Sequence, residues 1–208
     1  MSIIPKLATS LNRRDEVPNV ELAASIVARE SKMQVSELLY GLSHRNKGIR
    51  HDCIKVLYEI GKLRPRLIAE HYRLFVAILG NADNRLQWGA MTALSTIVAE
   101  RPREIYISLK EIVNAADKGS VITRDQCVKI LIALSATEKY AAKTFPLLLE
   151  QLTVCPTNQL PMYAENSIPA VNITNRDRFV ELLTARLGDL EKENAKKRVS
   201  KVINRVSK

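Results

Sequence analysis

The chain is poor in glycine, proline and aromatic side chains: its 208 residues include seven glycines, eight prolines and one tryptophan. A turn-rich β fold needs many residues that close tight turns, so this composition argues against one. Long apolar runs are also absent, and neither end carries a stretch long enough to span a membrane or to form a secretory signal. With abundant Leu, Ala, Ile, Glu and Lys, we expect a soluble, cytoplasmic, all-helical protein.

Cysteine and histidine are too few and too scattered to form a recognisable metal site. Cys53, Cys127 and Cys155 include no C-x-x-C pair, and the three histidines have no metal-ligand spacing. We expect the cysteines to be small core residues. A Gly-rich phosphate loop, a G-x-S-x-G elbow and an H-E-x-x-H motif are also missing. We therefore predict no metal, no cofactor and no catalytic residue, hence a protein that is not an enzyme.

The strongest positive signal is a repeat with a period of 37 residues. "RHDCIKVLYEIGKLRP" at residues 50–65 and "QWGAMTALSTIVAERP" at residues 87–102 share their apolar positions. Four rows of such positions recur, spaced i, i+4, i+8 and i+11, which is one face of an α-helix. The rows are Ile49, Leu86, Thr123 and Leu160; Cys53, Ala90, Cys127 and Ala164; Leu57, Leu94, Leu131 and Ile168; and Ile60, Ile97, Leu134 and Val171.

A row of capping residues precedes this second helix of each unit. Their side chains can accept hydrogen bonds from the first turn of a helix, which places the helix starts near residues 47, 84, 121 and 158. A further apolar row upstream predicts a first helix of about three turns, with Pro65 and Pro102 at its start. The capping row is Asn46, Asp83, Ser120 and Thr157, and the upstream row is Leu38, Phe75, Ile112 and Leu149. The predicted unit is therefore helix, turn, helix.

Helix pairs at fixed spacing bury their apolar faces against their neighbours, so they stack into a solenoid. We predict an all-α, right-handed α-α superhelix of about four pairs, the fourth being degenerate because of Pro161 and Pro169. Residues 1–32 form an N-terminal segment and a capping helix, for which Asn19 is the expected cap. Residues 33–172 form the repeats, and residues 173–208 form C-terminal capping helices with a basic tail.

The repeats resemble the HEAT-like family of the armadillo superfamily. The resemblance covers residues 35–172 and rests on the helix pairs and on the segments "NKGIR" (46–50) and "DNRLQ" (83–87). These segments are similar to the family's pattern of polar residue, spacer, apolar residue and Arg at the start of the second helix. Gln87 departs from this pattern, and the usual unit is longer, about 40–47 residues. The resemblance implies a curved binding scaffold, usually without catalysis.

Positive charge is concentrated at the C-terminal end. Residues 191–208 hold seven basic residues and two acidic ones, while Val199, Val202, Ile203 and Val206 form an apolar stripe. Two interpretations stay open for this helix: the solvated face of a cap, or a surface that binds phosphate or another anionic partner. The candidate tail residues are Lys196, Lys197, Arg198, Lys201 and Arg205.

The outward rows of the second helices are the candidate partner-binding surface. Residues one period apart are expected to lie one above another, which makes a ridge of cations, an aromatic residue and an anion. Trp88 is either an exposed interface anchor or a residue wedged between adjacent repeats with one edge exposed. The candidate residues are Arg50, His51, Lys55, Gln87, Trp88, Arg124, Asp125 and Lys129.

Two functions follow from this surface. The first is a non-enzymatic, monomeric scaffold that binds a protein or peptide partner through the second helices. The alternative is nucleic-acid binding, because the chain is basic and its repeats are similar to those of HEAT-like DNA alkylation-repair glycosylases. Trp88 with Asp125 is similar to that family's aromatic and carboxylate site, but a second aromatic residue is missing and four units are few for wrapping a duplex. Phosphate binding needs Lys and Arg along the concave rows, where Arg50, Lys55, Arg124 and Lys129 favour this alternative and Glu59 and Asp125 do not.

Overall fold

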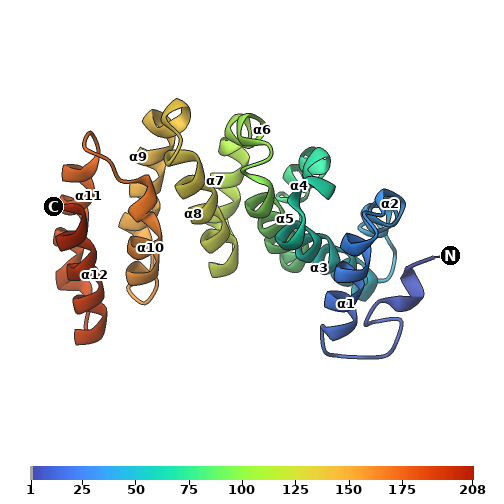
Figure 1. Cartoon of the computed structure of the whole chain (residues 1–208). Helices are drawn as coiled ribbons and strands as arrows, with labels where there is room; N and C mark the ends of the chain where they lie inside the picture. Colours follow the sequence, from blue (N-terminus) through green and yellow to red (C-terminus); the bar gives the residue numbers. More distant parts are fainter. Residues whose placement is uncertain (1) are drawn as a thin grey trace. The chain divides into compact units, whose positions relative to one another are not determined.

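The computed structural model describes residues 2–208, in which twelve α-helices, five short 3-10 helices and no β-strand are found (Figure 1). The predicted all-α class is confirmed. The chain divides into two compact units, Met1–Cys127 and Val128–Lys208, and the boundary falls inside helix α8 (Val121–Ser135). The predicted division at residues 32 and 172 and the right-handed superhelix stay predictions.

The first unit contains consecutive helix groups that pack side by side (Figure 1). Helix α3 packs against α1, α2 and α5, and α4 packs against α5. The α-helices are α1 (Val17–Ala28), α2 (Lys32–Gly41), α3 (Lys47–Leu63), α4 (Tyr72–Ile78), α5 (Asn84–Ile97), α6 (Pro102–Ile107) and α7 (Leu109–Lys118), with 3-10 helices η1 (Ile4–Lys6), η2 (Pro65–Leu67) and η3 (Ala69–His71).

The second helices begin where the capping row places them. Helices α3, α5 and α8 start at residues 47, 84 and 121, which are 37 residues apart. Asn46 accepts hydrogen bonds from the N–H groups of Gly48 and Ile49, Asp83 accepts one from Arg85, and Ser120 accepts one from Thr123. These side chains satisfy N–H groups that have no partner within the helix, which fixes each helix start.

The fourth cap was predicted wrongly. Thr157 lies before the helix in a turn, and α10 (Leu160–Ser167) begins after Gln159 without a side-chain cap. Pro161 stands in the first turn of α10, where a residue without an N–H group is tolerated, and Pro156 accepts a hydrogen bond from the Gln159 N–H. The two prolines thus delay the start of α10 beyond the predicted residue 158.

The first helix of the repeat is not a single helix between residues 65 and 118, so the two-helix unit is corrected there. Pro102 begins α6, and the chain breaks at Ser108 before α7 starts at Leu109. Pro65 likewise begins η2, which is followed by η3 and α4. Each proline starts a helical turn as predicted, but the first helix is then divided into η2, η3 and α4 after Pro65 and into α6 and α7 after Pro102.

The predicted apolar rows form the core. Phe75, Leu94 and Ile112 are fully buried, as are Leu38, Leu57 and Ile97 in the neighbouring positions. Ile168 and Val171 of the fourth unit are part-exposed, and α10 ends before them at Ser167, where η4 (Ile168–Ala170) with Pro169 follows. The predicted degeneracy of the fourth unit is therefore seen in its packing.

Helices α3 and α5 approach closely through two glycines. A Cβ atom on Gly89 of α5 would lie 2.6 Å from Cγ1 of Ile54 on α3. At the other end, a Cβ atom on Gly61 of α3 would collide with the hydroxyl of Thr96 on α5. Each helix therefore contributes one glycine that makes room for a side chain of the other.

The N-terminal segment is held against α1 and α3, and here Asn19 was interpreted wrongly. Asn19 lies inside α1, not at its start, and is almost fully buried. Its Oδ1 accepts a hydrogen bond from the Ala8 N–H at 3.1 Å, and its Nδ2 donates to Oδ1 of Asp52 at 2.8 Å. The other oxygen of Asp52 accepts a hydrogen bond from the Thr9 N–H at 2.7 Å. Asn19 and Asp52 therefore connect the N-terminal segment, α1 and α3.

The second unit contains α9 (Glu138–Val154), α10, α11 (Arg176–Arg186), η5 (Leu187–Asp189) and α12 (Glu193–Val206). Helix α12 packs against α10 and α11 and buries Val199 and Val202, as the apolar stripe predicted. Arg186 at the end of α11 donates hydrogen bonds to three carbonyl groups at the end of α9, those of Leu152, Thr153 and Cys155. These bonds satisfy acceptors that the end of α9 leaves free.

Candidate partner-binding surface

Arg50 and Gln87, which share one row of the repeat, make equivalent contacts inside the fold. Arg50 Nη1 donates hydrogen bonds to the carbonyl oxygens of His44 and Arg45, in the turn before α3. Gln87 Nε2 donates to the carbonyl oxygen of Leu79, just after α4. Both side chains fasten the turn that precedes their helix, so part of their hydrogen-bonding capacity is used internally.

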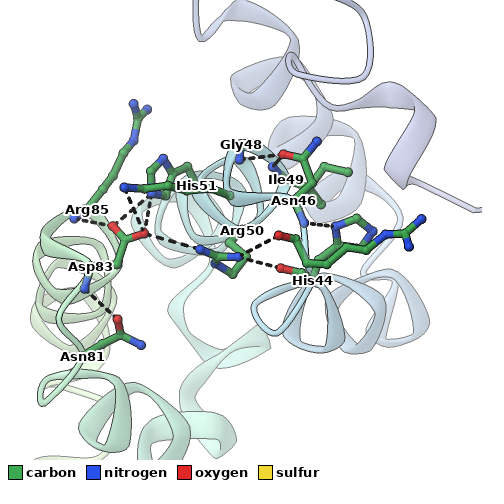
Figure 2. A network of polar contacts seen from close by, with 11 residues as sticks. His44, Asn46, Gly48, Ile49, Arg50, His51, Asn81, Asp83 and Arg85 are labelled. Carbon is green, nitrogen blue, oxygen red and sulfur yellow. Dashed lines mark hydrogen bonds and ion pairs between the residues drawn. The ribbon is translucent and has the colours of Figure 1, made fainter.

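His51 and Asp83 form the centre of a polar network between α3 and α5 (Figure 2). Nε2 of His51 lies 3.0 and 2.9 Å from the two carboxylate oxygens of Asp83. Lys47 and Arg50 lie farther from the same carboxylate, each at 3.8 Å. Burial alone would raise the pKa of Asp83, but the hydrogen bond from His51 and the nearby positive charge hold that pKa below its ordinary value.

Lys55 is the centre of a second network on the same pair of helices. Its Nζ lies 2.7 Å from a carboxylate oxygen of Glu16 and 2.8 Å from one of Glu59. Burial disfavours the charged amine, but the hydrogen bonds with these two carboxylates outweigh it and raise the pKa of Lys55. Glu16 also pairs with Arg85 of α5 at 2.8 Å, so α1, α3 and α5 are joined through one carboxylate.

Trp88 is half-buried and packs against Tyr58 of α3. The ring centroids are 5.8 Å apart and the planes are tilted by 50°, a favourable geometry for an aromatic pair. The amines of Lys55 and Lys62 each lie 4.9 Å from the centroid of the Tyr58 ring. Trp88 therefore has one part packed between consecutive second helices and another part accessible.

The other candidates from the second helices lie on α8. Arg124 and Asp125 are half-buried in the first unit, and Nε of Arg124 is buried without a hydrogen-bond partner in the described chain. Lys129 is exposed and belongs to the second unit. The structure thus brings Arg50 and His51 together at Asp83, and Lys55 and Trp88 together at Tyr58. The role of all eight candidates in partner binding stays a prediction.

The candidate tail residues lie on α12 and differ in their surroundings. Arg198 forms two hydrogen bonds with the carboxylate of Glu165 on α10, at 2.8 and 2.6 Å, and Lys196 pairs with Glu193 at 3.0 Å. Arg198 lowers the pKa of Glu165 through this hydrogen bond. Lys197, Lys201 and Arg205 are exposed.

Glu16 and Tyr58 belong to this surface but were not predicted. The pairing of Lys55 with Glu59 is visible in the sequence, because residues at i and i+4 face each other on a helix. Glu16 is 39 residues from Lys55 in the sequence and precedes another helix, so no local pattern predicts its contact.

Residues 2–208 contain neither a metal-binding cluster nor a membrane-spanning helix. No group of three or more His, Cys, Asp or Glu side chains is placed to hold a metal ion within this range. Within the same residues, every helix is too short or too polar to cross a membrane.

Comparisons with known proteins show the fold. No family model and no curated protein matches the sequence. Solved structures do match: an engineered protein from the Northeast Structural Genomics Consortium has a TM-score of 0.66 at 14% identity, covering 99% of both chains. A designed armadillo repeat protein in complex with the peptide (KR)4 has a TM-score of 0.63 at 15% identity, covering 100% of both.

An archaeal HEAT-like repeats protein from Thermococcus onnurineus NA1 also matches, with a TM-score of 0.50 at 13% identity over 93% of this chain and 97% of that chain. At such low identity these similarities establish the fold and leave the function open. The chain therefore has the all-α repeat fold of HEAT-like and armadillo repeat proteins.

Proposed function

We propose that this protein is a non-enzymatic scaffold that binds a peptide segment of a protein partner through the second helices of its first unit. The observation that carries the proposal is the half-buried Trp88, packed on Tyr58, whose ring also contacts the ion-paired Lys55 and Lys62. Trp and Tyr are enriched among the residues that dominate protein interfaces. Because Lys55 and Glu16 are already held in place, a partner has to order few side chains when it binds.

The charges of the candidate surface favour a neutral or acidic peptide. Two separate networks of ion pairs, one at Asp83 and one at Lys55, hold five cations and three carboxylates, so positive charge is in excess. Charge complementarity across an interface then favours a partner that is not basic. The cations are Lys47, Arg50, Lys55, Lys62 and Arg85, and the carboxylates are Glu16, Glu59 and Asp83.

The internal pairing of these cations does not favour the alternative of nucleic-acid binding along the second helices. Lys55 contacts two carboxylates, and Arg50 donates to backbone carbonyls and lies near Asp83. Phosphate binding at these residues would require these contacts to break or to be shared.

We further propose that the chain acts as a monomer in the cytoplasm. The three cysteines are free and buried, which supports a reducing compartment, where thiols are kept reduced. Size-exclusion chromatography with light scattering tests the monomer, and fluorescence microscopy of the tagged chain in its own cell tests the compartment.

The peptide proposal is tested by selecting binders from a random 12-residue peptide library displayed on phage. Selected peptides are synthesised, and their Kd is measured by fluorescence anisotropy for the unmodified chain and for Trp88→Ala. Loss of an interface anchor is expected to weaken binding by at least about 1 kcal/mol, which is roughly fivefold in Kd.

The control variant is Tyr40→Ala, since Tyr40 is an aromatic residue that is 85% exposed and lies on α2, outside the candidate surface. It is expected to leave the Kd unchanged. Failure to select any peptide, or selected peptides that lose more affinity with Tyr40→Ala than with Trp88→Ala, would refute the proposal.

A further inference from the structure

Helix α12 has one buried face and one cationic face. Val199 and Val202 are almost completely buried in its packing against α10 and α11. Lys197, Lys201 and Arg205 follow one another at intervals of four residues, so they share the opposite, exposed face. At a rise of about 1.5 Å per residue, this cationic stripe is about 12 Å long.

The three side chains of the cationic stripe make no hydrogen bond or ion pair with any described residue, unlike their neighbour Arg198. Lys201 influences the carboxylate of Glu165 electrostatically, and Glu193, one turn before Lys197, is paired with Lys196. Glu165 is already held by two hydrogen bonds from Arg198, so its negative charge is largely neutralised. The positive charge of the stripe is therefore left for an external anion.

A second arginine extends this charge onto α11. Arg176 and Arg205 line the same recess of about 280 Å³, together with Asn172 and the apolar side chains at the end of η4. Arg176 has only a long contact of 3.4 Å with its exposed neighbour Asp177. Guanidinium groups bind phosphate oxygens with two parallel hydrogen bonds, and the Asn172 amide supplies a further polar group.

We propose that the cationic stripe of α12, with Arg176, binds the phosphate backbone of double-stranded nucleic acid without reading its sequence. This surface is separate from that of the proposed function and does not depend on it. Backbone binding of this kind requires Lys and Arg facing solvent and needs no contact with the bases.

The structure favours a duplex over two other anionic partners. A membrane-surface helix inserts an apolar face among the lipids, and the apolar face of α12 is buried in the protein. Single-stranded nucleic acid is usually held by aromatic side chains on which bases stack, and residues 187–208 contain none. A row of exposed cations about 12 Å long suits the regularly spaced phosphates of a rigid duplex.

The test uses the full chain and a fluorescein-labelled 20-base-pair DNA duplex of mixed sequence, with anisotropy measured at 50 and 200 mM salt. For about three phosphate contacts, the Kd is expected to rise about 40-fold between these salt concentrations. The triple variant Lys197→Gln, Lys201→Gln, Arg205→Gln is expected to weaken binding at least tenfold and to flatten the salt dependence.

A matched control removes the same charge elsewhere through Lys32→Gln, Arg103→Gln and Lys110→Gln, three exposed cations of the first unit. The control is expected to bind the duplex within twofold of the unmodified chain. A third variant, Lys197→Arg, Lys201→Arg, Arg205→Lys, keeps the charge and is expected to keep the affinity.

Four outcomes overturn the proposal. They are a Kd weaker than about 100 μM at 50 mM salt, equal losses in the stripe variant and in the control, loss of binding in the charge-conserving variant, and binding to phosphatidylserine vesicles in place of the duplex.

Discussion

Asp83 caps helix α5 and at the same time accepts a hydrogen bond from His51 of α3, the equivalent helix of the preceding repeat (Figure 2). The carboxylate of Asp83 therefore fixes the start of α5 and also holds α5 against α3. Its side chain is only 12% exposed, so the contact with His51 is largely shielded from solvent.

The substitution Asp83→Asn separates these two roles, because Asn is an equally good helix cap but carries no charge. We expect the variant to be about 1 kcal/mol less stable at pH 7. The pKa of Asp83 is lower in the folded protein than in the unfolded chain, so the charged carboxylate stabilises the fold above a pH of about 3.9. This contribution is lost as the pH falls through the folded pKa.

Urea denaturation from pH 7 to pH 3 measures this difference. The difference in the free energy of unfolding between the unmodified chain and Asp83→Asn should become smaller as the pH falls toward 3. The control Asp177→Asn, at a carboxylate that is 90% exposed, should change the free energy of unfolding little at every pH. A gap that stays constant with pH would show that the charge of Asp83 contributes nothing.

Truncation of Leu94 tests the core. Leu94 is fully buried in the middle of α5, so Leu94→Ala removes apolar contacts and leaves a cavity. We expect a loss of about 2–5 kcal/mol in the free energy of unfolding. The control is Ile107→Ala on α6, at a residue that is 68% exposed, where a change below about 0.5 kcal/mol is expected. Equal effects at the two positions in chemical denaturation would contradict this account.

Asp52 is expected to be a stability residue. Asp52→Ala leaves the Asn19 amide and the Thr9 N–H without their acceptor in a buried place. We expect a loss of about 2–3 kcal/mol, together with faster amide hydrogen exchange in residues 3–9. If the exchange of this segment is unchanged, Asp52 does not hold it.

The close approach of α3 and α5 predicts that Gly89→Ala is destabilising, although alanine favours helices. The added Cβ would lie 2.6 Å from Ile54, and such overpacking costs about 1–3 kcal/mol. Gly188 has no neighbouring atom within 4 Å of an added Cβ, so Gly188→Ala is expected to be neutral or slightly stabilising. In the Ile54→Ala background, the penalty for Gly89→Ala should shrink. If Gly89→Ala costs the same stability in both backgrounds, contact with Ile54 is not the cause of the loss.

The helix starts could be predicted from the sequence because their signals are local. Asn46, Asp83 and Ser120 each bond to N–H groups two or three residues away, and the apolar rows follow directly. Thr157 gave the same signal, but the nearby prolines changed the backbone and moved the helix start. A cap is thus predictable only where the following residues can continue the helix.

The surroundings of the candidate surface could not be predicted in the same way. Periodicity shows which face of α3 carries Lys55, but not that Glu16 lies 2.7 Å from it. Asn19 looked like a cap because it stands near the start of a helix, while its partners Ala8 and Asp52 come from two other segments. Such contacts depend on how helices pack, which a single sequence does not encode locally.

The close contact of Gly89 with Ile54 has a consequence for the order of the repeat units, which one row of the repeat makes visible. Asp52, Gly89 and Gln126 stand one period apart, yet Asp52 holds the N-terminal segment, Gly89 admits Ile54, and Gln126 accepts a hydrogen bond from the Ser95 hydroxyl. A repeat unit carrying Gln at the Gly89 position would collide with Ile54, and one carrying Gly at residue 52 would leave the Asn19 Nδ2 group without its acceptor. Exchange of these repeat units would therefore break specific contacts, because equivalent positions carry residues that suit different neighbours.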